Sequence, residues 1–315
     1  MSKHWDAFCG LSLVHFLAFP ECQGGEGPIA ESIENIASDP FFSAIEVSRI
    51  NDPKLRVRIG QMISQSRMGV DFAAHPMILG ERLNLNSLDL KERNKAVAIL
   101  TTYFDQAAEL GARRFVILSG PDPGEGERAE AIKTLVESLQ RLCQRAAEYK
   151  LAIVLETFDR RVDKKALIGP ADIAASVAAS LKQDFPDFGL LYDMGHMVLL
   201  DENPMEAMTL LKEHLVHVHV GNAVKVPGRT GYGDLHPRFG FPGGENDVPQ
   251  LVEFLEALFQ IGYLRPIQIA EARANVGFEI RPQPGETSAT ILANIKRTWM
   301  QAWPYVNLRT IAPDA

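Results

Sequence analysis

The sequence predicts an α/β protein, a single (β/α)8 TIM barrel with an additional C-terminal helix. Short apolar or β-branched segments alternate with helical segments eight times, and eight units are the number at which such a parallel sheet closes into a barrel. No GxGxxG pattern follows the first strand, which disfavours an open dinucleotide-binding sheet. We find no sequence repeat, low-complexity segment or obvious linker that would divide the chain.

The predicted strands are short runs of apolar residues with room for a helix after each. They cover residues 11–19, 41–48, 68–75, 114–120, 151–158, 188–195, 215–222 and 266–272. Two of the helices between them have clear limits. One is predicted to start at Asn86, with Asp89 three residues on, and to end at Gly111; the other covers residues 248–262 and ends at Gly262.

The composition indicates a globular protein with a substantial core. Hydrophobic residues make up 46% of the chain and charged residues 23%, which is ordinary for a folded enzyme. We predict one barrel domain over residues 1–285, with residues 286–315 forming a helix and a tail that pack on it. The formal net charge of -8 disfavours nucleic acid as a partner. No apolar run reaches the roughly 18 to 20 residues that cross a bilayer, so we expect no membrane partner.

The three cysteines predict a reducing, cytoplasmic environment. Cys9, Cys22 and Cys143 cannot all pair within one chain, and they show no CxxC or zinc-finger spacing. Cys143 shares a helical face with apolar residues, which predicts a buried and inert core thiol.

Ionisable side chains close the last four predicted strands. They are Glu156 on the fifth strand, Asp193 and His196 on the sixth, His217 and His219 on the seventh, and Glu271 on the eighth. Because the carboxyl ends of barrel strands share one rim, these groups are expected to converge there. Carboxylates and imidazoles suit one divalent cation such as Mn, Mg, Co or Zn, and we expect no organic cofactor. Alternation places both histidines of the seventh strand on one face, so spacing alone does not choose between them.

Four short motifs at these strand ends resemble the xylose isomerase-like TIM barrel superfamily of sugar phosphate isomerases and epimerases, which also contains the type IV apurinic endonucleases. They are LET around Glu156, DMGH at 193–196, HVHVGN at 217–222 and AEA around Glu271. The similarity to the ketose 3-epimerases implies that one metal is held by Glu156, Asp193, His219 and Glu271. It also implies that His196 contacts the substrate and that the protein forms homo-oligomers.

The resemblance implies a metal-dependent isomerase or epimerase with a small-molecule sugar substrate, a ketose or keto-polyol. A cation bound to neighbouring substrate oxygens would stabilise an enediolate, and Glu156 and Glu271 would serve as the acid–base pair that removes and returns the proton. The alternative is a lyase or dehydratase that uses the same site for β-elimination from a keto-inositol or a 3-keto-glycoside.

A long loop at residues 221–247 departs from the epimerase pattern. Asp234 and His236 stand two apart in it and, together with His196, could form a second metal site like that of the endonuclease branch. The other interpretation is a loop that covers the substrate, with His236 and Arg238 in contact with it. Lys225 stands where the 3-epimerases usually have an arginine, so substrate recognition cannot simply be copied to it.

Three further residues at strand ends have more than one interpretation. His75 matches a metal histidine of the endonuclease branch, but Ser119 stands where a second histidine would be required, so a phosphodiesterase is less favoured and His75 is assigned to substrate binding. Glu46 could orient a ligand or cap the next helix. His15 is expected to pack in the core, and the same is expected of Trp299 and Trp303 in the last helix.

Overall fold

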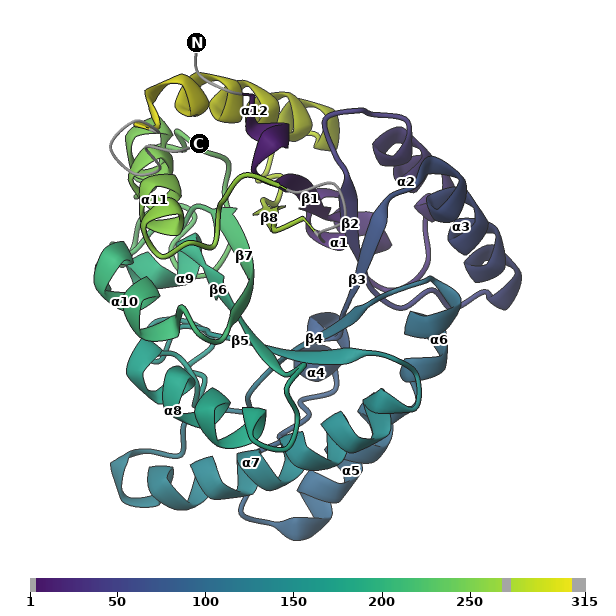
Figure 1. Cartoon of the computed structure of the whole chain (residues 1–315), viewed down its shortest axis with the longest axis vertical. Coiled ribbons are helices and arrows are strands. Elements are labelled where there is room, and N and C mark those ends of the chain that lie inside the picture. Colours follow the sequence, from purple (N-terminus) through teal and green to yellow (C-terminus); the bar gives the residue numbers. More distant parts are fainter. Residues whose placement is uncertain (1–3, 268–272, 308–315) are drawn as a thin grey trace.

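The computed structural model describes residues 4–267 and 273–307. Within them, eight parallel strands close into a barrel in sequence order, with β8 paired to β1 (Figure 1). The predicted (β/α)8 barrel is therefore confirmed. The strands are β1 Gly10–Val14, β2 Ala44–Val47, β3 Gly69–Ala73, β4 Arg114–Leu118, β5 Ala152–Glu156, β6 Gly189–Asp193, β7 Leu215–Gly221 and β8 Asn275–Glu279.

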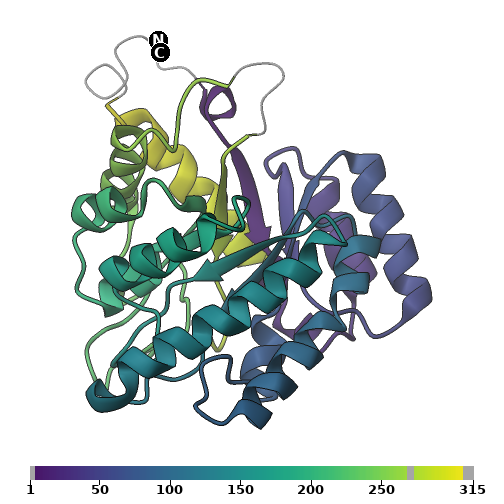
Figure 2. The same ribbon diagram turned by 60° about the horizontal axis from the view of Figure 1, so that its bottom comes forward.

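Helices surround the barrel and cover its outer face (Figures 1 and 2). Among the described residues, none of them combines the length and the apolar character needed to cross a membrane. The α-helices are α1 His15–Ala18, α2 Ile29–Ala37, α3 Pro53–Ser66, α4 His75–Gly80, α5 Leu90–Thr101, α6 Phe104–Glu109, α7 Glu125–Ala147, α8 Ala171–Lys182, α9 Met194–Leu199, α10 Pro204–Leu211, α11 Val248–Gln260 and α12 Ser288–Ala302. Short 3-10 turns are η1 Trp5–Ala7, η2 Pro20–Cys22 and η3 Trp303–Tyr305.

The strands are buried on both faces, as their apolar sequences predict for a parallel barrel. Outward side chains such as Phe72 and Phe115 join the large core beneath the helices. Inward side chains include a small apolar cluster of Val116, Val154 and Leu191. Because successive side chains alternate between the two faces, Glu156 and Asp193 stand one layer above Val154 and Leu191. Glu156 and Asp193 therefore rest on this apolar cluster inside the barrel.

The helix predicted from Asn86 to Gly111 is two helices. Asp89 is the N-cap of α5, because its carboxylate accepts the Lys91 N–H at 2.8 Å. Asn86 instead donates its side-chain amide to the Pro121 carbonyl at 2.9 Å, which ties the loop to the end of β4. Gly111 follows α6 with a φ of 80°, a left-handed conformation that favours glycine.

The predicted eighth strand is wrong. The strand that closes the barrel is β8, and its residues Asn275 to Phe278 pair with β1. Residues 268–272, and with them Glu271, lie outside the described residues. Ile267 donates its N–H to the Ala7 carbonyl at 2.9 Å, before β1 begins, so the predicted segment starts at the N-terminal end of the barrel.

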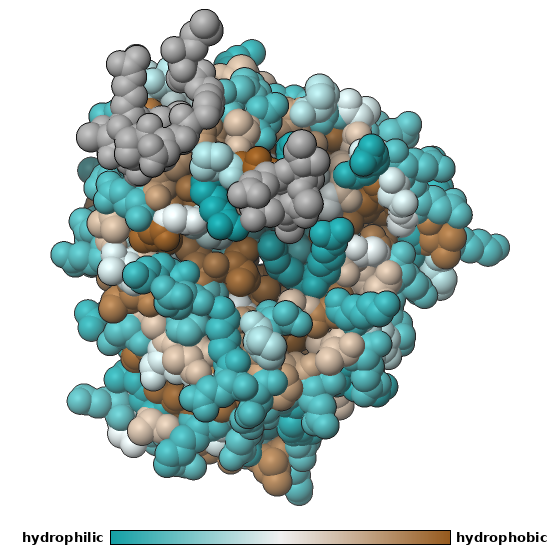
Figure 3. Space-filling model, in the orientation of Figure 1, coloured by the Kyte–Doolittle hydropathy of each residue, from teal (hydrophilic) through white to brown (hydrophobic). Residues whose placement is uncertain are grey.

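The helix expected near the C-terminal end is α12, which follows β8 and lies beside α11 in the outer ring (Figure 1). Trp299 of this helix is fully buried, and its ring meets Phe278 of β8 edge-on with centroids 5.6 Å apart. Trp303 stacks on Trp299 at 5.8 Å. The predicted packing role of both tryptophans is confirmed. Hydrophilic side chains are prominent around the periphery of the face shown in Figure 3, and the buried apolar residues of the outer helices join the core cluster.

Cys143 and His15 are core residues, as predicted. Cys9, Cys22 and Cys143 are buried and free, and burial raises the pKa of the Cys143 thiol to about 12. His15 is buried against Ser32, whose hydroxyl lies 2.8 Å from its Nε2. Burial lowers the pKa of His15 to about 4, so this imidazole is neutral at pH 7.

Candidate active site

Carboxylates and imidazoles from five strands meet inside the C-terminal mouth of the barrel. Parallel pairing sets their heights, because Asp193 is in register with His219, and Glu279 is in register with Gly221 two residues further along β7. All of these side chains are buried. The group consists of Glu46 on β2, Glu156 on β5, Asp193 on β6, His217 and His219 on β7, and Glu279 on β8.

The centre of the site is His219. Its Nδ1 lies 2.7 Å from Glu279 Oε2 and 3.6 Å from Glu156 Oε1. Single donor atoms of Asp193, His219 and Glu279 lie within 4.8 Å of one another, and the same holds for Glu156, His196 and Glu279. Glu156, Asp193 and His219 thus lie together, and Glu279 joins them from the end of β8.

The oxygens of this group are short of partners. Among the described residues, no hydrogen bond of good geometry reaches either carboxylate oxygen of Glu156 or Oδ2 of Asp193. Asp193 uses only Oδ1, which accepts the N–H groups of Gly195 and His196 at the start of α9. Buried, unpaired carboxylate oxygens are costly unless they bind a cation. Three carboxylates and an imidazole are a ligand set that fits a divalent metal.

The charges of the site depend on one another. Burial alone would lower the pKa of the His219 imidazole, but the carboxylates of Glu46, Glu279 and Glu156 hold this pKa well above its usual range. Burial raises the pKa of Asp193 to about 6, against the opposing effect of His196. Protons on the imidazoles therefore balance the carboxylates in the metal-free site, and metal binding would displace them.

A second group lies beside the first and contains Asp234. His236 Nε2 is 2.7 Å from Asp234 Oδ1, and His196 Nδ1 is 3.4 Å from the same oxygen. The other oxygen, Oδ2, is 2.8 Å from the ammonium of Lys164. Lys164 is delivered by the loop after β5, which Asp159 shapes by accepting the N–H groups of residues 162–164. A lysine thus already supplies a positive charge to this group.

Aromatic and imidazole rings line one wall of the site. The Phe158 ring lies 4.1 Å from the ring of His196 and 5.6 Å from the ring of His75, measured between centroids. His75, the first residue of α4, brings Nε2 to 2.9 Å from Glu156 Oε2 without hydrogen-bond geometry. His75 and His196 therefore present ring nitrogens next to the central carboxylates.

Comparison with known proteins shows the family of this barrel. Residues 42–296 match the family described as the xylose isomerase-like TIM barrel. The chain belongs to this family. No curated protein matches the sequence.

Solved structures of similar fold align with nearly the whole of this xylose isomerase-like barrel. An L-ribulose 3-epimerase aligns with a TM-score of 0.72 and 14% identity, covering 98% of both chains. The IolI protein with a bound zinc atom has a TM-score of 0.70 and 16% identity, covering 95% of this chain and 99% of its own. A D-tagatose 3-epimerase-like protein has a TM-score of 0.69 and 18% identity, covering 96% and 99%. At these identities the likeness shows the fold.

Two residues predicted to bind substrate in this xylose isomerase-like barrel make contacts elsewhere. Lys225 pairs with Asp201 at 3.2 Å, and 44% of its side chain is exposed. Arg238 binds Glu286 at 2.8 Å, which ties the long loop to the segment before α12. The structure does not bring either cation to the central carboxylates.

Two site residues of this barrel were not singled out from the sequence. Glu279 is the last residue of the alternating segment NVGFE, in which Val276 and Phe278 face outward, and that alternation was a usable signal. Lys164 gave no such signal, because it lies in a polar loop and its partner Asp234 is far away in the sequence.

Proposed function

We propose that this protein is a divalent-metal-dependent isomerase or epimerase of a small sugar, either a ketose or a keto-polyol. The observation that carries the proposal is that Glu156, Asp193, His219 and Glu279 converge at the mouth of the barrel, where buried oxygens of Glu156 and Asp193 have no hydrogen-bond partner among the described residues. The names of the similar structures support it, since two are 3-epimerases or resemble one and a third binds zinc.

When bound, a divalent cation supplies Lewis-acid polarisation of the substrate carbonyl. Glu156 and Glu279 stand on β5 and β8, so the two carboxylates approach the site from different sides of the barrel. One takes the proton from the carbon beside the carbonyl, and the other returns a proton to the opposite face, which is epimerisation. Return of the proton to the adjacent carbon is isomerisation. Glu279 takes the role that the sequence assigned to Glu271.

The wall residues orient the substrate. Among the described residues, His75 Nε2 and both ring nitrogens of His196 have no hydrogen-bond partner, although all three atoms are buried. Sugar hydroxyls donate and accept hydrogen bonds, so they match such groups. The Phe158 ring between the two imidazoles excludes water from that side of the substrate.

One metal ion is favoured over two. The second group, His196, Asp234 and His236, has three suitable donor atoms within 4.8 Å of one another, but the Lys164 ammonium lies 2.8 Å from Asp234 Oδ2. A cation placed next to this ammonium would be repelled by it. A pair of metals suits phosphate-ester hydrolysis, so Lys164 favours carbon–hydrogen chemistry over hydrolysis.

The test is proton exchange with solvent. Protein loaded with Mn or Zn is incubated with a panel of ketopentoses and ketohexoses in D2O, and deuterium uptake at the carbon beside the carbonyl is followed by NMR. We expect uptake with at least one ketose, reduced roughly 100- to 10,000-fold by Glu156→Gln or Glu279→Gln. The exposed Glu253 gives the control Glu253→Gln, which should retain exchange.

Three outcomes count against the proposal. They are the absence of exchange with every ketose in metal-loaded protein, the persistence of exchange in both glutamine variants, and a conjugated product that absorbs in the ultraviolet. The last would assign the same site to β-elimination.

A further inference from the structure

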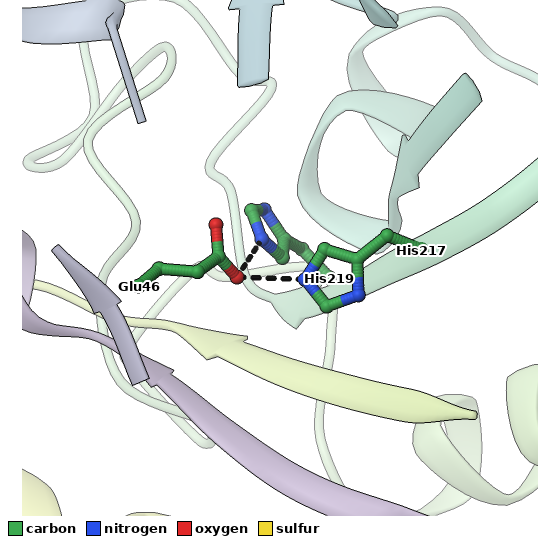
Figure 4. Close-up of side chains that lie close together, drawn as sticks. All are labelled: Glu46, His217 and His219. Atoms are coloured by element: carbon green, nitrogen blue, oxygen red, sulfur yellow. Dashed lines mark hydrogen bonds and ion pairs between the residues drawn. The ribbon is translucent and has the colours of Figure 1, made fainter. Parts of the chain in front are cut away.

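Glu46 lies beneath the candidate metal ligands and makes contacts that the proposed reaction does not use. It stands on β2, across the barrel from β7, and its side chain is fully buried. Oε1 lies 2.7 Å from Nε2 of His217 and 2.7 Å from Nε2 of His219 (Figure 4). One carboxylate oxygen thus binds two imidazoles from the same strand.

These contacts fix which ring nitrogens carry hydrogen. An ionised carboxylate accepts hydrogen bonds and cannot donate them, so Nε2 of both His217 and His219 must be the donor. In the neutral ring of His219, the lone pair then lies on Nδ1. Without a metal, Nδ1 lies 2.7 Å from Glu279 Oε2 and 3.6 Å from Glu156 Oε1, and by the same rule it donates to Glu279. A metal bound there would displace this proton and use the Nδ1 lone pair, while Nε2 keeps its hydrogen on Glu46.

We propose that Glu46 is a positioning residue that holds His219 in the Nε2–H tautomer and aims its Nδ1 lone pair at the metal ligands. The inference rests on the metal site of the proposed function. Carboxylates that bind the far nitrogen of a ligating histidine fix its orientation and raise its basicity. His217 supplies the second donor to Glu46 and is not itself a ligand.

The geometry disfavours a separate metal at Glu46, His217 and His219, although these residues bring donor atoms within 4.8 Å of one another. His219 would then have to give Nε2 to that metal and Nδ1 to the central group. A neutral imidazole has only one free lone pair. The two distances of 2.7 Å are also those of charge-assisted hydrogen bonds.

Strand β8 packs against this contact and confines it. Gly277 is in register with both Ser12 of β1 and His219. A Cβ atom at this glycine would lie 2.8 Å from His219 Cδ2 and 3.0 Å from Glu46 Oε1. Any side chain at position 277 would therefore collide with the Glu46–His219 pair, and glycine leaves the space that the pair occupies.

The test compares zinc affinity in Glu46→Gln and Asp71→Asn by competition with a chromophoric chelator. Asp71 is the matched control because it is buried, is in register with Glu46 on β3, and binds Arg114 at 3.2 Å rather than a metal ligand. We expect the zinc Kd to rise roughly 10- to 100-fold in Glu46→Gln and to stay close to the wild-type value in Asp71→Asn. Equal losses in both variants would assign the effect to charge alone and overturn the proposal, as would wild-type affinity in Glu46→Gln.

A measurement on the wild-type protein guards against misfolding of the variants. In zinc-loaded protein with 15N-labelled histidine, the His219 ring should show hydrogen on Nε2 and zinc on Nδ1. The opposite assignment overturns the positioning role while leaving the metal site intact. Wild-type protein that binds no zinc would overturn the proposed function and this role together, so the two failures are distinguishable.

Discussion

Lys164 shows how one side chain can set the charge of the group formed by His196, Asp234 and His236. Its ammonium is 2.8 Å from Asp234 Oδ2, and Asp163 of the same loop accepts the Asp234 N–H at 3.0 Å. The loop therefore holds both the backbone and the carboxylate of Asp234. Burial alone would raise the pKa of Asp234, but His196, His236 and Lys164 hold it well below its usual range, so the carboxylate is ionised and already neutralised by protein groups.

Lys164→Met removes this ammonium while keeping a side chain of similar length. We expect zinc content, measured by elemental mass spectrometry in excess zinc, to rise from one to two ions per chain, because His196, Asp234 and His236 become free to bind. The neighbouring Lys165 is exposed, and Lys165→Met should leave one ion. Two ions in the wild type, or one ion in Lys164→Met, would contradict the role given to Lys164.

At the scale of elements, the first seven strands overlap their predicted segments, because each presents apolar side chains to both faces of the sheet. The sequence analysis did not predict β8, because two of its inward positions are Gly277 and Glu279 and the strand therefore lacks a continuous apolar run. The same feature makes β8 functional: Gly277 gives room for His219, and Glu279 joins the candidate ligands.

Helix α12 is anchored to β8 through one aromatic contact. Trp299 is fully buried between Phe278 and Trp303. We expect Trp299→Ala to lower the free energy of unfolding by about 3–5 kcal/mol, because a large cavity opens under the helix. The next residue, Met300, is 49% exposed. Met300→Ala should therefore change the free energy of unfolding by less than about 0.5 kcal/mol. Denaturant titration measures the free energy of unfolding of both variants. Equal losses would show that Trp299 does not anchor α12 to β8.

At the scale of the whole molecule, barrel closure explains which site residues could be predicted. Glu156 and Asp193 end β5 and β6, and His219 lies two residues before the end of β7, so topology alone places all three at one rim. Glu46 faces His219 from the other side of the barrel, and such a contact depends on strand register and closure. The contact between Lys164 and Asp234 depends on the paths of two loops, one after β5 and one after β7. Sequence patterns therefore identify the rim of the site, whereas its orientation and charge balance require the three-dimensional structure.

The candidate metal group joins β5, β6, β7 and β8, so metal binding should stabilise the whole barrel. Zinc at 100 times its Kd adds about 2.7 kcal/mol to the free energy of unfolding if only the native state binds. We expect a chelator to lower the thermal midpoint of metal-loaded protein by several degrees. The control is Asp193→Asn, because asparagine can still cap α9 but loses the ligand charge. Its midpoint should respond little to chelator, and an equal response would show that the metal binds elsewhere.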